Sequence, residues 1–354
     1  MKNFLYILAL QIFLLLFTGA SCGMPSKNIK TGGVFKSVDR GSTWEQKVKI
    51  EKKKTIASVS VLSMAIDPHN SKVIYIGTEN KGIYKTENSG DSWKQLAINN
   101  GSVNSIALDP KSEGIVYAVN SGKVFKSTDG GAQWQMIYIE SGGGSINTVV
   151  VDFYDSKNIY TGTSNGGFLK SADYGNSWSI LKWFDSSIKY IVINPNDTRQ
   201  IYVVTAGKLY KTNDSGLSWE DISGNLKDFK GADKINCIYV KNEVYLGTEA
   251  GLLKSADAGV SWESLRILIP PKKPLITSIT VSPENSREIY FSSGATLFRS
   301  LDGGLNWQVV QLPTSRRIEV IKIDPENPDI IYIGVKFIKE KKKGFLPYQP
   351  VPPK

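Results

Sequence analysis

The chain has 354 residues, a length that by itself suggests two domains of ordinary size. Its formal net charge of +10 at pH 7 raises the question of an anionic partner. His69 is the one histidine, which excludes a histidine-based catalytic triad and a cluster of histidine metal ligands.

The first residues are typical of an export signal. Lys2 precedes an apolar run at residues 4–17, too short to favour a permanent membrane span, and small residues lead from there to Cys22. The sequence Gly-Ala-Ser-Cys resembles a bacterial lipobox, although Leu is more usual at its first position, and implies a mature chain that begins at lipid-modified Cys22. Ordinary signal cleavage, or retention of the signal as an anchor, are the alternatives. We expect a signal peptide at residues 1–21, a linker at 22–31 and a lipid anchor on the extracytoplasmic side of a membrane, in the periplasm or at the cell surface.

From residue 32 onward an eight-residue motif, Ser/Thr-x-Asp-x-Gly-x-x-Trp, recurs seven times. Its third position is held by Asp39, Asn88, Asp129, Asp173, Asp214, Asp257 and Asp302. It closes on Trp44, Trp93, Trp134, Trp178, Trp219, Trp262 and Trp307. Successive tryptophans lie 41–49 residues apart, in the range of one four-stranded propeller blade. The repeat therefore overrules the two-domain estimate and predicts one closed ring.

The motif has a physical explanation as a turn. Its glycine suits a backbone position with positive φ, its Asp accepts backbone N–H groups across the turn, and its Trp can bury against the neighbouring repeat. These residues resemble the Asp-box, or BNR, motif of sialidases, sortilin-type receptors, xyloglucanase-type glycosidases and photosystem II assembly factors. Asn88 departs from that pattern, as do Gln133 and Asn306 at the position before the tryptophan. The resemblance implies a propeller.

Each repeat reads as four short strands bounded by turn residues, expected in the first complete repeat at residues 62–66, 73–77, 82–86 and 93–97. The first repeat, residues 32–49, supplies only a third and a fourth strand, and the last, residues 318–337, only a first and a second. We therefore predict an all-β, seven-bladed propeller over residues 32–338, closed by pairing of the N-terminal and C-terminal strands, and then a basic, proline-containing tail at residues 339–354.

Strand direction assigns each loop to one of two faces. The upper face carries the loops between blades and those between second and third strands. The lower face carries the seven motifs and the turns between first and second strands. In the related propellers, binding and catalysis use the upper face. We therefore expect the aspartates of the motif to be structural.

Candidate chemistry is sparse. Of the arginines only Arg266, Arg316 and Arg317 reach the upper face, and they come from adjacent loops, unlike the convergent arginines of a sialidase. Xyloglucanases place two aspartates across a cleft between tandem propellers, and one propeller is predicted here. The upper acids Asp185, Asp228 and Asp233 are scattered among lysines. No calcium loop, phosphate loop or dinucleotide motif is present, so we expect no metal and no cofactor. Cys237 reads as a buried core thiol.

Basic and aromatic residues mark the upper face. The basic candidates for a binding face are Lys52, Lys53, Lys54, Arg266, Lys272, Lys273, Arg316, Arg317 and, in the tail, Lys341, Lys342 and Lys343. They favour contact with anionic lipid or a membrane-embedded partner, unless they only keep the loops soluble. Trp183 and Phe184 form a second candidate. If exposed, this pair makes a platform for a sugar or a protein; the alternative is ordinary packing between blades.

We therefore expect a monomeric, non-catalytic exported lipoprotein that acts as a binding or assembly scaffold for envelope or membrane-embedded proteins. This is similar to the role of the photosystem assembly factors and sortilin-type ectodomains. The alternative is a surface carbohydrate-binding protein or a glycoside hydrolase of the Asp-box type, so enzymatic activity stays open and a glycan is a further candidate partner. Export argues against nucleic acid.

Overall fold

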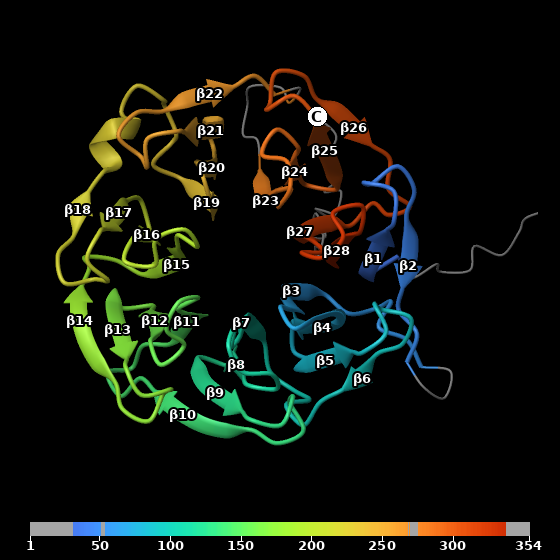
Figure 1. Cartoon of the computed structure of the whole chain (residues 1–354), viewed down its shortest axis with the longest axis horizontal. Coiled ribbons are helices and arrows are strands. Elements are labelled where there is room, and N and C mark those ends of the chain that lie inside the picture. The colour runs from blue at the N-terminus through green and yellow to red at the C-terminus, as the bar shows by residue number, and fades with distance from the viewer. Residues whose placement is uncertain (1–30, 51–53, 268, 270–274, 338–354) are drawn as a thin grey trace, which may run out of the picture. The chain divides into compact units, whose positions relative to one another are not determined.

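The structure is a computed structural model that describes residues 31–50, 54–267, 269 and 275–337. These residues form seven sheets, each of four antiparallel strands, arranged in a ring (Figure 1). Among them the regular elements are strands, apart from one turn of 3-10 helix, η1 (Ser223–Leu226). The predicted all-β, seven-bladed propeller of four-stranded blades is therefore confirmed.

The blades follow one another in chain order, and the first strand of each lies nearest the centre of the ring (Figure 1). Blade 1 contains β3 (Val61–Asp67), β4 (Asn70–Thr78), β5 (Ile83–Thr86) and β6 (Lys94–Gln95). Blade 2 contains β7 (Val103–Leu108), β8 (Val116–Asn120), β9 (Lys123–Ser127) and β10 (Gln135–Ile139). Blade 3 contains β11 (Ile146–Val151), β12 (Ile159–Thr163), β13 (Gly167–Ser171) and β14 (Ser179–Trp183).

The remaining blades repeat this plan. Blade 4 contains β15 (Ile188–Ile193), β16 (Ile201–Thr205), β17 (Leu209–Thr212) and β18 (Glu220–Asp221). Blade 5 contains β19 (Ile235–Val240), β20 (Val244–Thr248), β21 (Gly251–Ser255) and β22 (Glu263–Leu265). Blade 6 contains β23 (Ile276–Val281), β24 (Ile289–Ser293), β25 (Thr296–Ser300) and β26 (Gln308–Val310). Blade 7, the closing blade, contains β27 (Arg317–Ile323), β28 (Ile331–Lys336), β1 (Gly33–Ser37) and β2 (Glu45–Lys47).

The closing blade joins the two ends of the described chain. Strand β1 pairs antiparallel with β28, with Phe35 opposite Ile333 and Ser37 opposite Ile331. Strands β27 and β2 complete the sheet on either side. The pairing removes the free sheet edges that an open ring would leave, and it confirms the predicted closure.

The core lies between the blades. Every residue of β8, β12, β16 and β20 is buried, because neighbouring blades cover both faces of these second strands. The motif tryptophans contribute to this packing as predicted. Trp219 of blade 4 lies edge-on against Phe168 of blade 3, with ring centroids 4.9 Å apart.

Tyrosines in the second strands of blades 1, 2, 4 and 6 bond to the following blade. The Tyr75 hydroxyl donates to the Gly130 carbonyl oxygen (3.1 Å), and that of Tyr202 donates to the Ala258 carbonyl oxygen (3.2 Å). Each acceptor belongs to the motif of the following blade. At these four junctions the phenol satisfies a backbone acceptor of the neighbouring blade, a role that was not predicted from the sequence.

Candidate functional site

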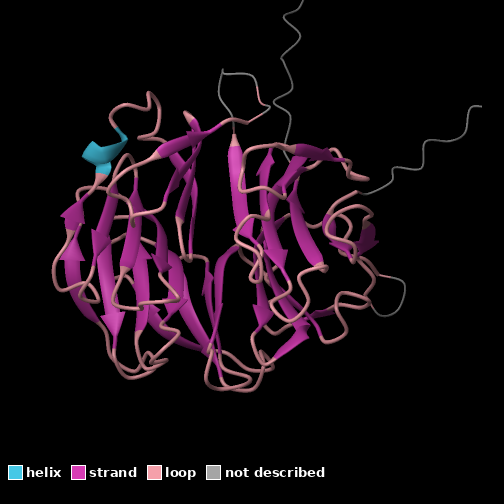
Figure 2. Ribbon diagram, turned by 45° about the horizontal axis from the view of Figure 1, so that its top comes forward, coloured by secondary structure: helices cyan, strands magenta, loops and turns pink. Residues whose placement is uncertain are grey.

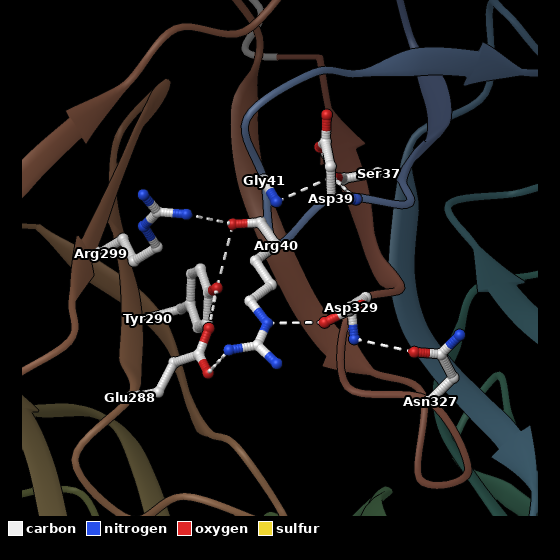
Figure 3. Close-up of polar contacts among 9 residues, drawn as sticks. All are labelled: Ser37, Asp39, Arg40, Gly41, Glu288, Tyr290, Arg299, Asn327 and Asp329. Carbon is white, nitrogen blue, oxygen red and sulfur yellow. Dashed lines mark hydrogen bonds and ion pairs between the residues drawn. The ribbon is translucent and has the colours of Figure 1, made fainter.

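The lower face is organised by the seven Asp boxes, and Figure 3 shows the first of them. The Ser37 hydroxyl donates to Asp39 Oδ1 (2.7 Å) and accepts the Gly41 N–H (2.7 Å), while Asp39 accepts the Thr43 N–H (2.8 Å). Gly41 has φ +85°, as expected, and Arg40 before it is also left-handed, with φ 55°. Two successive left-handed residues make the sharp reversal that these side-chain bonds hold in place.

The same box is locked to its surroundings. The Arg40 N–H donates to the Asp329 carbonyl oxygen (2.9 Å), which places the motif and the turn between β27 and β28 at the same end of the blade. The Arg40 carbonyl oxygen accepts the Tyr290 hydroxyl (3.0 Å) and Arg299 Nη1 (2.8 Å) from blade 6 (Figure 3). The box is therefore a contact between blades as well as a turn.

The carboxylates of the Asp boxes are held by hydrogen bonds from their own turns. Asp214 accepts hydrogen bonds from the Ser218 hydroxyl (2.6 Å), the Ser218 N–H (2.8 Å) and the Thr212 hydroxyl (2.6 Å), which lower its pKa to about 2. Hydrogen bonds from Ser177 do the same for Asp173, and those from Ser261 for Asp257. An acid that stays ionised down to about pH 2 is a poor proton donor near neutral pH. This geometry is that of a structural turn.

The upper face carries a hollow at the seam between the closing blade and blade 1, which we call the rim pocket. It has a volume of about 540 Å³ and is lined by Ser58, Val59, Ser60, Glu79, Asn80, Lys81, Arg317, Lys336 and Phe337. The Gly32 N–H donates to the Ala57 carbonyl oxygen (3.0 Å), and the Phe337 N–H donates to the Ser60 hydroxyl (3.2 Å). Phe337, at one end of the described chain, therefore lines the pocket, and Gly32, at the other end, bonds to the residue before Ser58 of the lining.

Cations outnumber anions in and beside the rim pocket. Arg317 is paired with Glu319 (2.6 Å) and Lys336 with Glu79 (3.7 Å). Lys81 is exposed and forms no ion pair with any described residue. The Arg316 guanidinium lies 4.1 Å from the centre of the Phe337 ring, in a cation–π contact.

This arrangement leaves positive charge available at the mouth of the pocket. Basic side chains at such a position can bind a carboxylate or a phosphate group. Arg316 and Arg317 are predicted from the sequence as part of a binding face, whereas Lys81 and Lys336 are not. Topology contained the signal for both, because Lys336 ends β28 at the upper face and Lys81 lies in the upper-face loop between β4 and β5.

The two aromatic candidates on the upper face are separated. Trp183 ends β14 and is 51% exposed, and a Cβ added at Gly167 would lie 3.1 Å from its ring, so the indole covers that glycine. Phe184 is buried, with its ring 4.5 Å from that of Tyr210. The structure therefore corrects the paired platform: Phe184 packs between blades, and Trp183 alone presents a surface. Strand β14 lies across the ring from the closing blade (Figure 1).

Of the other basic candidates, the structure describes only two. Lys54 and Arg266 are exposed in the loops after β2 and β22, and neither lines the rim pocket. Cys22, Lys52, Lys53, Lys272, Lys273, Lys341, Lys342 and Lys343 lie outside the described residues, as do the predicted signal peptide and nearly all of the linker and tail. Of the predicted basic face, the structure places Arg317 in the wall of the rim pocket and Arg316 beside it, over the Phe337 ring.

Acidic and metal-binding constellations do not form in the described part of the chain. Asp185, Asp228 and Asp233 are exposed, and no hydrogen bond or ion pair joins any two of them. Nowhere in residues 31–50, 54–267, 269 and 275–337 do three His, Cys, Asp or Glu side chains gather as metal ligands would. Over those residues there is also no helix with the length and apolar character of a membrane span.

Known proteins resemble the chain in parts of its sequence. Residues 32–137 match the family model described as Sortilin, neurotensin receptor 3. A xyloglucanase of Paenibacillus sp is 26% identical over 203 residues, covering 43% of this chain and 20% of the relative. Xyloglucanase Xgh74A of Acetivibrio thermocellus is 27% identical over 207 residues, covering 44% of this chain and 24% of the relative. The chain thus spans about a quarter or less of the length of these curated relatives.

Solved structures share the fold. The GH74 xyloglucanase from Xanthomonas campestris has a TM-score of 0.64 at 17% identity, over 78% of this chain and 51% of that one. YCF48 bound to D1 peptide has a TM-score of 0.61 at 15% identity, over 79% and 94%. YCF48 from Cyanidioschyzon merolae has a TM-score of 0.60 at 13% identity, over 78% and 95%. Together with the seven Asp boxes, these findings confirm the resemblance to the Asp-box propellers.

Proposed function

We propose that the protein is a non-catalytic propeller, exported and anchored by lipid at Cys22, that binds an acidic segment of an envelope or membrane protein at its rim pocket. The observation that carries the proposal is the excess of cations at the pocket, where Lys81 has no ionic partner among the described residues. YCF48, which shares the fold, has been solved with a D1 peptide bound, and this supports a peptide or protein as the partner.

The pocket suits a partner that carries its own carboxylates. Glu79 holds Lys336 in place, and Glu319 holds Arg317. A carboxylate of the partner could bind beside these ion pairs without breaking any packing in the core. Charge complementarity of this kind mainly raises the rate of association and selects the partner. Binding should therefore weaken as salt rises.

Charge reversal tests the proposal. The intact chain, a Lys81→Glu/Lys336→Glu variant and a Lys72→Glu/Lys157→Glu control would be used to capture proteins from detergent-solubilised envelopes. Lys72 lies near the lower end of β4 and Lys157 lies in a lower-face turn. Both are exposed, so the control makes the same change in net charge. We expect the captured protein to be lost with the first variant and retained with the control. Equal capture by all three would reject the rim pocket as the binding site.

Vesicles separate a protein partner from a lipid surface. The unlipidated chain would be mixed with vesicles of neutral lipid and with vesicles that contain anionic lipid. If the chain bound the anionic vesicles and not the neutral ones, and if the Lys81→Glu/Lys336→Glu variant lost this binding, the pocket would be assigned to lipid headgroups instead of a protein.

Glycan binding is the second candidate, and Trp183 favours it. Its exposed indole covers Gly167, and aromatic faces of this kind stack on sugars. The similarity to xyloglucanases supports the choice of a xyloglucan oligosaccharide as the probe. The oligosaccharide would be titrated into the protein while tryptophan fluorescence is followed. Quenching that Trp183→Ala abolishes, and that Ile180→Ala on the same strand leaves unchanged, would support this function. Release of reducing sugar from xyloglucan would show hydrolysis and overturn the non-catalytic proposal.

A further inference from the structure

The first strands of the seven blades present one residue each at the same level of the ring, opposite the buried tyrosine of the second strand. In blade order these residues are Ala65, Ala107, Val150, Val192, Tyr239, Thr280 and Lys322. Six of these positions are uncharged. The closing blade places a lysine among them.

A cavity of about 530 Å³ opens beside Lys322 in the lower half of the ring. Strands β3, β7, β11, β15 and β27, together with the turns that follow four of them, supply its walls, and these walls are mostly Ala, Val, Ile, Leu and Pro. Lys322 is the one charged residue among its lining residues. Ala65 and Ala107, in the two blades that follow the closing blade, are small, and this leaves room beside the lysine side chain. A volume of this size suits a small organic ligand.

The charge of Lys322 is not neutralised by the protein. Its side chain is solvent-exposed within the channel and lies against the apolar walls of the cavity. No described residue forms an ion pair or a hydrogen bond with its ammonium group. An ammonium group that is free of protein partners can therefore form a charge-assisted hydrogen bond with the anionic group of a ligand. The cavity therefore has the chemistry of a site for one anionic group.

The turn of blade 3, at the mouth of the cavity, differs in sequence from the corresponding turns of most other blades. After their first strands, blades 1, 2, 4, 6 and 7 carry proline in the turn, at Pro68, Pro110, Pro195, Pro283 and Pro325. Blade 3 carries Phe153 and Tyr154, which are 48% and 83% exposed, and Phe153 lines the cavity. Aromatic surface at the opening extends the apolar walls outward.

We propose that this lower-channel cavity binds an apolar monocarboxylate, with the carboxylate on Lys322 and the apolar body against the walls of blades 1 to 4. Charge complementarity requires the anion, and the apolar lining requires the rest of the ligand to be hydrophobic. The site lies at the opposite end of the ring from the rim pocket, and it does not depend on the function proposed there.

Calorimetric titration of the full chain with decanoate, and with decanol as the neutral probe, tests the proposal. We expect saturable binding of decanoate, weakened by about tenfold or more in Lys322→Met, and weaker binding of decanol that this substitution leaves unchanged. Lys72→Met, which removes an exposed lysine near the lower end of β4, is the control and should bind decanoate normally.

A second variant covers the case in which Lys322→Met does not fold. Ala107→Leu adds bulk to the wall of the cavity and should weaken decanoate and decanol alike. Absence of saturable decanoate binding to the unaltered chain, or decanoate binding that neither Lys322→Met nor Ala107→Leu changes, would overturn the proposal.

Discussion

Trp93 tests how the ring is closed. Its side chain is 1% exposed and packs in one cluster with Val34 and Tyr332 of the closing blade. Its indole N–H donates to the Lys47 carbonyl oxygen (2.9 Å), also in that blade. Replacing Trp93 with Ala removes this packing and leaves a buried acceptor without its donor. Substitutions of this kind cost about 3–5 kcal/mol.

Trp44 provides the matched control. It holds the same motif position, but it is only half-buried, and its indole N–H returns to the Gly41 carbonyl oxygen of its own box (3.0 Å). Because it loses less buried area, we expect Trp44→Ala to cost roughly 1–2 kcal/mol.

Thermal unfolding followed by circular dichroism distinguishes the two variants. At roughly 2 °C per kcal/mol for a ring of this size, Trp93→Ala should lower Tm by about 6–10 °C, and Trp44→Ala by less than half of that. Equal losses for the two variants, or a loss below about 2 °C for Trp93→Ala, would refute the role of Trp93 in joining the closing blade to blade 1.

Three further predictions follow from the turns and the core. The pKa of Asp214 is about 2 in the folded chain, against 3.8 ordinarily, so its stabilising effect is present above pH 4 and is lost as pH falls towards 2. Asp214→Asn should therefore flatten the dependence of Tm on pH in this window. An unchanged slope would contradict the structural role of this carboxylate. Gly166 has φ +93°, and a Cβ there would collide with the Phe184 carbonyl oxygen, so Gly166→Ala should cost about 1–3 kcal/mol in urea unfolding; Gly224→Ala, where nothing lies within 4 Å, is the control, and a similar cost at both positions would oppose the argument. Burial raises the pKa of the Cys237 thiol to about 12, so it should react with a thiol reagent at pH 8 only after unfolding; fast reaction of the native chain would show that the strand opens.

The regular part of this structure could be predicted from the sequence because the repeat encodes it. Gly41 and its six counterparts identify the position that needs positive φ, and the spacing of the tryptophans gives one blade per repeat. The left-handed conformation of the residue before this glycine could not be predicted from the sequence, because residues such as Arg40 and Tyr174 have no preference for positive φ.

The sites were harder to predict because they depend on how distant segments meet. Lys81 and Lys336 are 255 positions apart in the chain and come together only across the seam. Trp183 and Phe184 are predicted as one platform, but neighbouring residues of an extended segment point to opposite sides. The structure buries Phe184, which directly follows β14. Lys322 stands out only when the register of all seven blades is compared.

Site-specific photocrosslinking in intact cells tests the proposed binding face most directly. A photoreactive amino acid would replace Lys81 in the rim pocket or, as the control, Lys72 on the lower face. The proposal predicts a discrete adduct with one envelope or membrane protein from position 81 and none from position 72. An adduct from position 72 alone, or the same adduct from both positions, would contradict the assignment of binding to the upper rim.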